Sequence, residues 1–262
     1  MSSKASISPK EVTRLIKKLH PFRFEKGLIR VGPNKDGGYL VPNDLEGIHS
    51  CFSPGVGDCS DFELWCFNQG INIFLADGSV DYPDLDLDAK DFHFLKKFIG
   101  QKDDAKCVSL NTWVQSHNYD NNNDLLLQMD IEGAEYDCLF EATSTLLKRF
   151  RIMIIEFHEL DRLWQPDFFR RAEIVFEKIL DTHVCIHIHP NNNVKIYSQS
   201  MVDIPPVAEF TFIRKDRTKS TRYETRLPHR LDYDNSMDLP SLVLPDIWYK
   251  KRWWDRVFSL FG

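Results

Sequence analysis

The first residues whose types and spacing could form a ligand-binding site make up a turn that contains two glycines. Segment 53–58, Ser-Pro-Gly-Val-Gly-Asp, stands between an apolar run predicted to be a strand (50–56) and a predicted helix (61–69). Glycines at such a turn let the backbone approach a ligand that a side chain would block, and the helix N-terminus offers free N–H groups. The third glycine of a dinucleotide fingerprint is missing, so the turn alone indicates only a ligand site in an α/β fold.

A carboxylate follows the next apolar run. Asp77 ends the predicted strand 71–77, precedes Gly78, and stands 20 residues after Gly57. An acid at this place can accept hydrogen bonds from both hydroxyls of a ribose. A single Asp is more often a turn residue or a helix cap, but its pairing with the glycine turn at this spacing predicts a nucleoside-binding site.

Two further carboxylates, Asp130 and Glu132, stand at the end of the predicted strand 124–131. Open α/β sheets bind ligands at the carboxyl ends of their strands. Glu135 falls in the first turn of the following helix, where the helix dipole favours an anion. Helix capping explains Glu135 but suits Asp130 poorly, because Asp130 ends a buried apolar strand. Asp130 and Glu132 are therefore catalytic candidates.

At segment 129–135, Met-Asp-Ile-Glu-Gly-Ala-Glu, the sequence resembles the FkbM-like methyltransferases. The resemblance extends to Asp-Gly-Gly-Tyr at 36–39, to segment 53–58 and to Ile-Glu-Phe-His at 155–158, and it covers roughly residues 28–215. It implies a Rossmann-like class I methyltransferase fold, with a seven-stranded, mostly parallel α/β sheet, an antiparallel last strand and helices on both faces. It also implies S-adenosylmethionine as methyl donor and O-methylation of a hydroxyl, often on a sugar or polyketide.

The resemblance also implies roles for single residues. Gly55 and Gly57 would line the methionine part of the cofactor, Asp77 its ribose, and Asp130 the region beside the transferring methyl. Pro54 departs from the more usual Gly or Phe, which leaves the geometry of the turn open. The complete predicted cofactor-binding set is Pro54, Gly55, Val56, Gly57, Asp58, Asp77, Gly78 and Asp130.

The implied reaction needs a group that takes up a proton. Methyl transfer from a sulfonium is an in-line displacement, and a weakly acidic hydroxyl must lose its proton to a base or a metal-assisted site. His158, at the end of the predicted strand 151–158, is the preferred base because its unperturbed pKa lies near neutrality. Glu156 and Glu132 are competitors, and a purely structural role for His158 is the alternative.

A second histidine group lies in the predicted strand 183–189. His187 and His189 share one strand face, and together with Asp130 and His158 they could bind a divalent metal. The prediction is that no residue ligates a metal. The asparagine run 191–193 is interpreted as a turn at the site rim that could bond a polyhydroxylated acceptor.

Segment 35–39, Lys-Asp-Gly-Gly-Tyr, predicts a tight turn before a short strand at 39–41. This turn is either a plain hairpin or a lid over the cofactor, with Asp36 or Tyr39 reaching in.

Strands alternate with helical patterns, which predicts a parallel sheet covered on both faces. Continuous apolar runs such as 152–155 are typical of strands buried on both sides. The acidic stretch 78–91 is predicted to be a loop. The predicted strands are 50–56, 71–77, 92–99, 124–131, 151–158, 183–189 and 207–214, and the predicted helices are 10–19, 61–69, 110–116, 134–148 and 167–180.

Composition narrows the class of protein. Hydrophobic residues make up 42% of the 262 residues, enough for a sizeable core, and the net charge of −6 argues against a general nucleic-acid binder. The six cysteines are scattered without a CxxC pair, which indicates reduced thiols rather than a zinc site. Neither a signal peptide nor an apolar run of about 18 residues is seen, so we expect a cytoplasmic protein.

The chain divides into three predicted parts. These are an N-terminal helical segment (1–27), the methyltransferase domain (28–216) and a C-terminal extension (217–262) that packs on the domain or a partner. Segment 248–258 is basic and aromatic, so peripheral membrane contact is the alternative to packing on the domain. The expected partner is a small-molecule or glycan acceptor, whose identity the sequence does not encode; neither does it encode the oligomeric state.

Two other functions fit parts of the pattern. An NAD-dependent oxidoreductase or epimerase would use the same glycine turn. This sequence, however, lacks the third glycine and has no Tyr-x-x-x-Lys pair after the fourth predicted strand. A non-catalytic binding module would have no need for acids and histidines at several strand ends.

Overall fold

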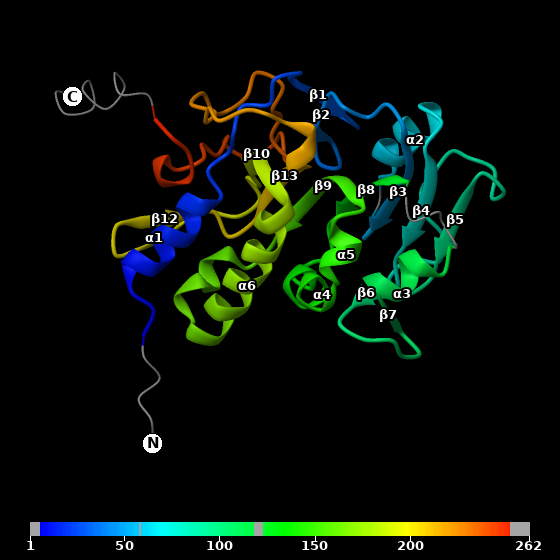
Figure 1. The fold of residues 1–262 in the computed structure, drawn as a ribbon, viewed down its shortest axis with the longest axis horizontal. Coiled ribbons are helices and arrows are strands. Elements are labelled where there is room, and N and C mark those ends of the chain that lie inside the picture. Colours follow the sequence, from blue (N-terminus) through cyan, green and yellow to red (C-terminus); the bar gives the residue numbers. More distant parts are fainter. Residues whose placement is uncertain (1–5, 58, 118–122, 252–262) are drawn as a thin grey trace.

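The computed structural model describes residues 6–57, 59–117 and 123–251. In this part of the chain, seven strands form one sheet in the order β10-β13-β9-β8-β3-β4-β5 (Figure 1). β13 runs antiparallel to β10 and β9 on its two sides, and all the other neighbouring strands of this sheet are parallel. The prediction of a seven-stranded, mostly parallel sheet is therefore confirmed. The strands are β3 (Ile48–Pro54), β4 (Asn72–Ala76), β5 (Phe92–Leu95), β8 (Asp124–Met129), β9 (Phe150–Phe157), β10 (His183–Pro190) and β13 (Ala208–Arg214).

The strand order reverses between β3 and β8. The chain runs from β3 outward to β4 and β5, and then returns to the other side of β3 to form β8 and β9. The carboxyl ends of β3 and β8 consequently feed loops that leave in opposite directions. A crevice opens at such a topological switch point, and ligands of open α/β sheets bind there.

Helices and short strands surround this sheet. The α-helices are α1 (Pro9–Lys18), α2 (Asp61–Asn68), α3 (Leu110–Gln115), α4 (Glu135–Glu141), α5 (Ser144–Leu147) and α6 (Pro166–Thr182). Short 3₁₀ turns are η1 (Leu160–Trp164), η2 (Lys215–Arg217) and η3 (Asp246–Trp248). The described ranges also contain three two-stranded pairs: β1 (Leu28–Val31) with β2 (Tyr39–Pro42), β6 (Phe98–Gly100) with β7 (Cys107–Ser109), and β11 (Tyr197–Gln199) with β12 (Val202–Ile204).

Two predicted elements are each divided in the structure. The predicted strand 92–99 is β5 followed by β6, which pairs with β7 outside the main sheet. The predicted helix 134–148 breaks into α4 and α5, because Thr143 has an extended backbone and its side chain accepts a hydrogen bond from the Leu146 N–H. A Thr that caps a new helix competes with continuation of the preceding one.

The core lies on both faces of the sheet, since successive strand residues point to opposite sides. Phe52, Leu127 and Met153 belong to one buried cluster, which includes residues of α1, α4 and α6. Their chain neighbours Cys51 and Leu126 belong to a second cluster, formed with α2 and the β1–β2 hairpin. The strand tips are thus held between two packed layers, which fixes the loops that follow them.

The described part of the C-terminal extension packs on the sheet and on the N-terminal segment. Trp248 is fully buried in the first cluster, and its Nε1–H donates to the Asp203 carbonyl at 3.0 Å. Tyr223 stacks on Phe22 at 4.4 Å between ring centroids. The rest of the basic aromatic segment, 252–258, lies outside the described residues. Within the described ranges, no helix has the length and apolar character needed to cross a membrane.

Candidate active site

The tips of β3, β4 and β8 meet at one edge of the sheet. The Gly55 N–H donates to the Ala76 carbonyl at 3.0 Å, and the Asp130 N–H donates to the Pro54 carbonyl at 3.2 Å. The Val56 N–H donates to Oδ2 of Asp77 at 3.2 Å. The glycine turn, Asp77 and Asp130 are therefore joined directly by hydrogen bonds.

Gly55 has to be a glycine at this junction. Its φ is +82°, and a Cβ atom built on it would lie 1.5 Å from the Asp130 carbonyl oxygen. Only a residue without a side chain allows β3 and β8 to approach this closely. Gly57 also has a positive φ of +46°, whereas a Cβ on Gly78 would meet the ring of Phe98.

A cavity of about 420 Å³ opens between the glycine turn, the loop before β2 and the end of β8. Five of the predicted site residues line it: Gly55, Val56, Gly57, Asp130 and Glu132. Its other lining residues are Lys35, Asp36, Gly37, Tyr39, Cys59, Phe62, Glu63 and Gln128. Of the remaining predicted residues, Pro54, Asp77, Gly78 and His158 do not line the cavity, and Asp58 lies outside the described residues.

The turn before β2 belongs to a hairpin that also reaches the site. β1 and β2 pair antiparallel, as a plain hairpin requires, yet Asp36 and Tyr39 both line the cavity. The C-terminal extension braces this hairpin, since the Asn235 side-chain amide donates to Asp36 at 2.9 Å and to Glu209 at 3.0 Å.

Asp77 is buried and its carboxylate is already engaged. Oδ1 accepts from the Ser79 N–H at 2.7 Å and from the Ser79 hydroxyl at 2.6 Å, while Oδ2 accepts from Val56. A ribose that bound here through two hydroxyls would have to replace Ser79 as a donor to Oδ1.

Glu63 is a site residue that the sequence reasoning missed. It is only 3% exposed, lines the cavity from α2, and its Oε1 bonds the Ser53 hydroxyl. Among the described residues, no hydrogen-bond partner reaches Oε2 of Glu63. Burial raises the pKa of Glu63 to about 7. The available signal was an acid inside the otherwise apolar run 62–67.

His158 lies within a group of carboxylates at the ends of β8 and β9. Its Nδ1 is 3.1 Å from Oε1 of Glu135, and its Nε2 is 3.4 Å from Oε2 of Glu132 and 3.8 Å from Oδ1 of Asp130. Glu132 has a left-handed backbone with φ of +55°. Such a conformation is strained for a residue other than glycine and is common at functional sites.

The acid–base properties of this group follow from burial and neighbouring charge. Burial alone would lower the pKa of His158, but the Glu135 hydrogen bond and the charges of Glu135, Asp130 and Glu132 outweigh it and raise that pKa. Burial, with help from Glu132 and Glu135, raises the pKa of Asp130 to about 7 even though His158 opposes the shift. Glu156 is also buried, and its pKa rises well above the ordinary value because Asp130 and Glu209 add to the effect.

The ligand atoms of Asp130, Glu132 and His158 lie within 4.8 Å of one another, close enough to hold one divalent cation. His187 and His189 do not join them. Nε2 of His187 is 2.9 Å from Asp232, and Nδ1 of His189 is 3.7 Å from it. The hypothesis that these two histidines share a metal site with Asp130 and His158 is therefore wrong. The two histidines face an acid of the C-terminal extension instead.

The asparagine run forms the predicted turn, but two of its amides are used inside the protein. Asn191 donates to Oε1 of Glu156 at 2.7 Å, and Asn192 donates to the Ser236 carbonyl at 2.8 Å. Both asparagines are buried. They therefore hold the C-terminal extension and Glu156 in place rather than face an acceptor.

A sequence model of the methyltransferase FkbM domain matches residues 49–180, slightly more than half of the chain. The chain belongs to the FkbM methyltransferase family. The resemblance found in the sequence is thereby confirmed, and the matched region contains the glycine turn, Asp77, Asp130 and His158. Among curated proteins, no sequence matches the chain. The β1–β2 hairpin, whose residues Lys35, Asp36, Gly37 and Tyr39 line the cavity, and the C-terminal extension, which braces that hairpin through Asn235, fall outside the matched region.

Proposed function

We propose that this FkbM methyltransferase uses S-adenosylmethionine and methylates a hydroxyl of a sugar, a glycan or another small polar acceptor. The observation that carries the proposal is that hydrogen bonds join the glycine turn to the ends of both neighbouring strands at one sheet edge: the Gly55 N–H to the Ala76 carbonyl, the Val56 N–H to Asp77, and the Asp130 N–H to the Pro54 carbonyl. That edge is the topological switch point, where a nucleoside cofactor is expected in an open α/β sheet. The antiparallel β13 and the packing of helices against both core clusters support the Rossmann-like class I fold.

The cavity and the strand tips beside it offer groups for the methionine portion, the ribose and the α-amino group of the cofactor. The backbone of the glycine turn can approach the methionine portion closely, since Gly55 has no side chain. Asp77 is the candidate for the ribose hydroxyls, with Ser79 released as they bind. The free Oε2 of Glu63 is the candidate for the positively charged α-amino group, because a buried carboxylate is stabilised by a cation beside it.

The proton of the acceptor hydroxyl goes to His158 in this proposal. Nδ1–H of His158 donates to Glu135, which leaves Nε2 as the basic nitrogen. Nε2 faces Asp130 and Glu132, and these two acids line the cavity. Asp130 and Glu132 then orient the acceptor beside the methyl group. The protein thereby supplies alignment and a base, the two requirements of an in-line methyl transfer.

Calorimetry with the full-length chain tests the cofactor assignment. S-adenosylmethionine and S-adenosylhomocysteine should both bind, and Asp77→Asn should weaken both by about tenfold or more, since a charged hydrogen-bond acceptor is lost. Asp86→Asn, at an exposed acid in the 78–91 loop, should leave the affinity unchanged. A wild-type chain that binds neither compound removes the proposal.

A titration with Mn²⁺ separates the base from a metal-assisted mechanism. If S-adenosylhomocysteine release continues in the presence of EDTA and no Mn²⁺ binds, His158 acts as a base. If Mn²⁺ binds to the wild type but not to Glu132→Gln, and EDTA stops turnover, His158 is a ligand and its role as the base is wrong.

A further inference from the structure

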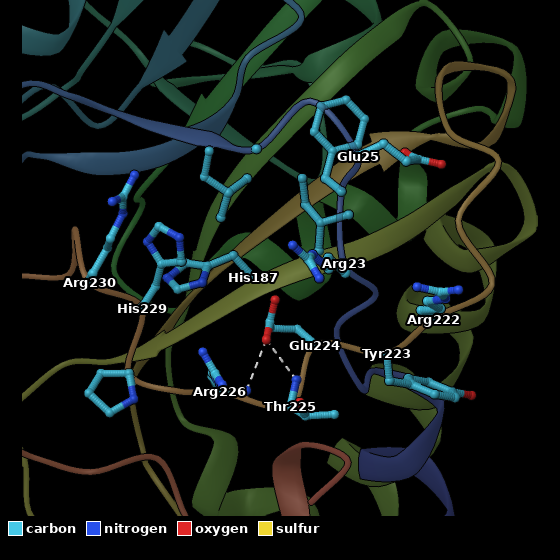
Figure 2. A pocket seen from close by; sticks show the side chains of 15 residues that line it. Arg23, Glu25, His187, Arg222, Tyr223, Glu224, Thr225, Arg226, His229 and Arg230 are labelled. Atoms are coloured by element: carbon cyan, nitrogen blue, oxygen red, sulfur yellow. Dashed lines mark hydrogen bonds between the residues drawn. The ribbon is translucent and has the colours of Figure 1, made fainter. Parts of the chain in front are cut away.

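A second pocket, larger than the cavity of the candidate active site, lies elsewhere in the molecule. It has a volume of about 700 Å³ and is bounded by segments 23–28 and 222–230, with His187 of β10 in its wall (Figure 2). Within the described chain, it shares no lining residue with the candidate active site. We call it the arginine pocket, because four arginines line it: Arg23, Arg222, Arg226 and Arg230.

None of these four guanidinium groups forms an ion pair with a carboxylate in the part of the chain that the structure describes. Other arginines in the same protein do: Arg151 pairs with Asp124 at 2.6 Å, and Arg217 pairs with Asp44 at 2.7 Å. Four like charges around one recess repel one another, so an anion from solution is attracted to it.

The acids in the arginine pocket are occupied by other donors. Glu25 accepts from the Thr218 hydroxyl at 2.8 Å and from the Lys219 N–H at 2.9 Å. Oε1 of Glu224 accepts from its two following backbone N–H groups, at 2.8 and 2.9 Å. Four arginines therefore face two carboxylates, which leaves an excess of positive charge.

The walls of the pocket are fixed before any ligand arrives. The Arg23 N–H donates to the Arg222 carbonyl at 2.8 Å, and the Glu224 N–H donates to the Pro21 carbonyl at 2.7 Å. These bonds flank an antiparallel bridge between Phe22 and Tyr223. The N-terminal segment and the C-terminal extension thus present their arginines from a paired backbone, which lowers the entropic cost of binding.

The arrangement combines two kinds of recognition. Figure 2 shows Glu224 in the middle of the pocket, with His229 and Arg230 on one side, Arg222 on the other, and His187 in the wall near His229. A guanidinium group binds phosphate through two parallel hydrogen bonds. The Glu224 carboxylate keeps Oε2 available to accept from a hydroxyl, since its two backbone donors both use Oε1.

We propose that the arginine pocket binds a phosphorylated polyol, with phosphate on the arginines and a hydroxyl on Glu224. The volume lies within the range of about 300–1,000 Å³ that small-molecule sites occupy. The inference does not depend on methyl transfer. The same chemistry is offered by a soluble sugar phosphate and by a phosphoinositide headgroup, and the experiment distinguishes these sources.

Calorimetry of the full-length chain with fructose 1,6-bisphosphate tests the soluble source. The salt concentration is about 150 mM, because this level already screens weak surface contacts. Cosedimentation with vesicles containing phosphatidylinositol 4-phosphate tests the headgroup. Arg226→Gln with Arg230→Gln should weaken binding at least tenfold in whichever arm shows it. Arg170→Gln is the matched control, because Arg170 is an exposed arginine on α6 that pairs with Asp167.

Glu224→Gln gives a test with the opposite sign. It keeps an oxygen for the two backbone donors but removes a negative charge, so inorganic pyrophosphate should bind the variant more tightly than the wild type. The proposal is overturned if neither phosphate probe binds, if unphosphorylated fructose binds equally well, or if Arg170→Gln loses as much affinity as the double variant. Equal melting temperatures of the variants show that losses come from the pocket and not from unfolding.

Discussion

Nδ1 of His158 lies 3.1 Å from Oε1 of Glu135, a carboxylate that has no solvent exposure. The same oxygen accepts from the N–H groups of Ile131 at 3.2 Å and Gly133 at 3.0 Å. The loop that follows β8 therefore fixes Glu135, and Glu135 fixes the imidazole ring of His158, the residue directly after β9. A buried carboxylate on one ring nitrogen sets the tautomer and raises the basicity of the other.

The first prediction concerns the pH dependence of turnover. His158 can accept a proton only in its neutral form, and its carboxylate neighbours raise its pKa above 6.5. Turnover should therefore fall as the pH decreases through that raised pKa. Glu135→Gln removes the carboxylate that raises the pKa of His158 most, so it should move the acid limb of kcat to lower pH, with little change in KM for S-adenosylmethionine.

His158→Gln is the companion variant, and it should reduce kcat by about 10²- to 10⁴-fold, the usual contribution of a general base. Rates of S-adenosylhomocysteine release, measured across the pH range, provide both tests. An acid limb that persists unchanged in His158→Gln would assign the proton transfer to another group, with Glu156 and Glu132 as the competitors.

The second prediction concerns the affinity for the cofactor. Glu63 can pair with a positively charged group only when it is ionised, and its pKa is about 7 before ligand binding. Affinity for S-adenosylmethionine should therefore fall as the pH drops below about 7, and binding near pH 7 should release a proton. Glu63→Gln should abolish this dependence and weaken binding about tenfold at pH 8, where the acid is charged.

Calorimetry in two buffers with different ionisation enthalpies measures the proton release directly. Equal heats in both buffers at pH 7, or the same pH dependence in Glu63→Gln, would exclude Glu63 from the recognition of the cofactor.

The site residues at the strand tips could be predicted because each follows a recognisable apolar run in the sequence. The glycine turn, Asp77 and Asp130 directly follow apolar runs, and carboxyl ends of parallel strands share one sheet edge. Glu63 was missed because an acid in a helix is ordinarily assigned to the solvent side. The division of the predicted helix 134–148 was missed because the Thr143 cap depends on a competition that apolar periodicity does not report.

Contacts made by the C-terminal extension could not be predicted at all. Asp232 and Asn235 lie in a polar stretch without periodicity, and their partners His187 and Glu209 are on β10 and β13. Such pairs are joined only by the tertiary fold. For the same reason, the sequence alone does not show that the acid beside His187 and His189 is Asp232, and it leaves the two histidines as candidate metal ligands.

The third prediction concerns the closeness of β3 and β8. Gly55→Ala places a methyl group 1.5 Å from the Asp130 carbonyl oxygen, in addition to the positive φ. We expect a loss of stability of about 3 kcal/mol or more, together with loss of cofactor binding. Gly70→Ala is the control, because Gly70 has a similar φ of +78° but nothing within 4 Å of the added carbon.

The control should cost only about 1–2 kcal/mol, the penalty for a left-handed backbone at a residue with a side chain. Urea denaturation of both variants measures the difference. Equal losses in the two proteins would mean that β8 moves away easily, and the close approach would then not be required for folding.

The last prediction concerns stability at low pH. His183 is fully buried, its Nε2–H donates to the Phe150 carbonyl at 2.7 Å, and its Nδ1 is 2.8 Å from the Thr182 hydroxyl. Burial lowers the pKa of His183 from 6.5 to about 4. Between these two pH values the unfolded chain binds a proton that the folded chain does not. The stabilising contribution is therefore complete above about pH 6.5 and is lost as the pH falls toward 4.

The full contribution corresponds to about 3 kcal/mol. The free energy of unfolding should decrease less between pH 7 and pH 4.5 for His183→Gln than for the wild type, even though the variant is less stable at pH 7. His93→Gln, at an exposed histidine, serves as the matched control. Buried acids with raised pKa values, such as Glu63, act in the opposite direction, but they are common to all three proteins and cancel in the difference between their slopes. Parallel slopes for His183→Gln and the wild type would show that another group controls stability in acid.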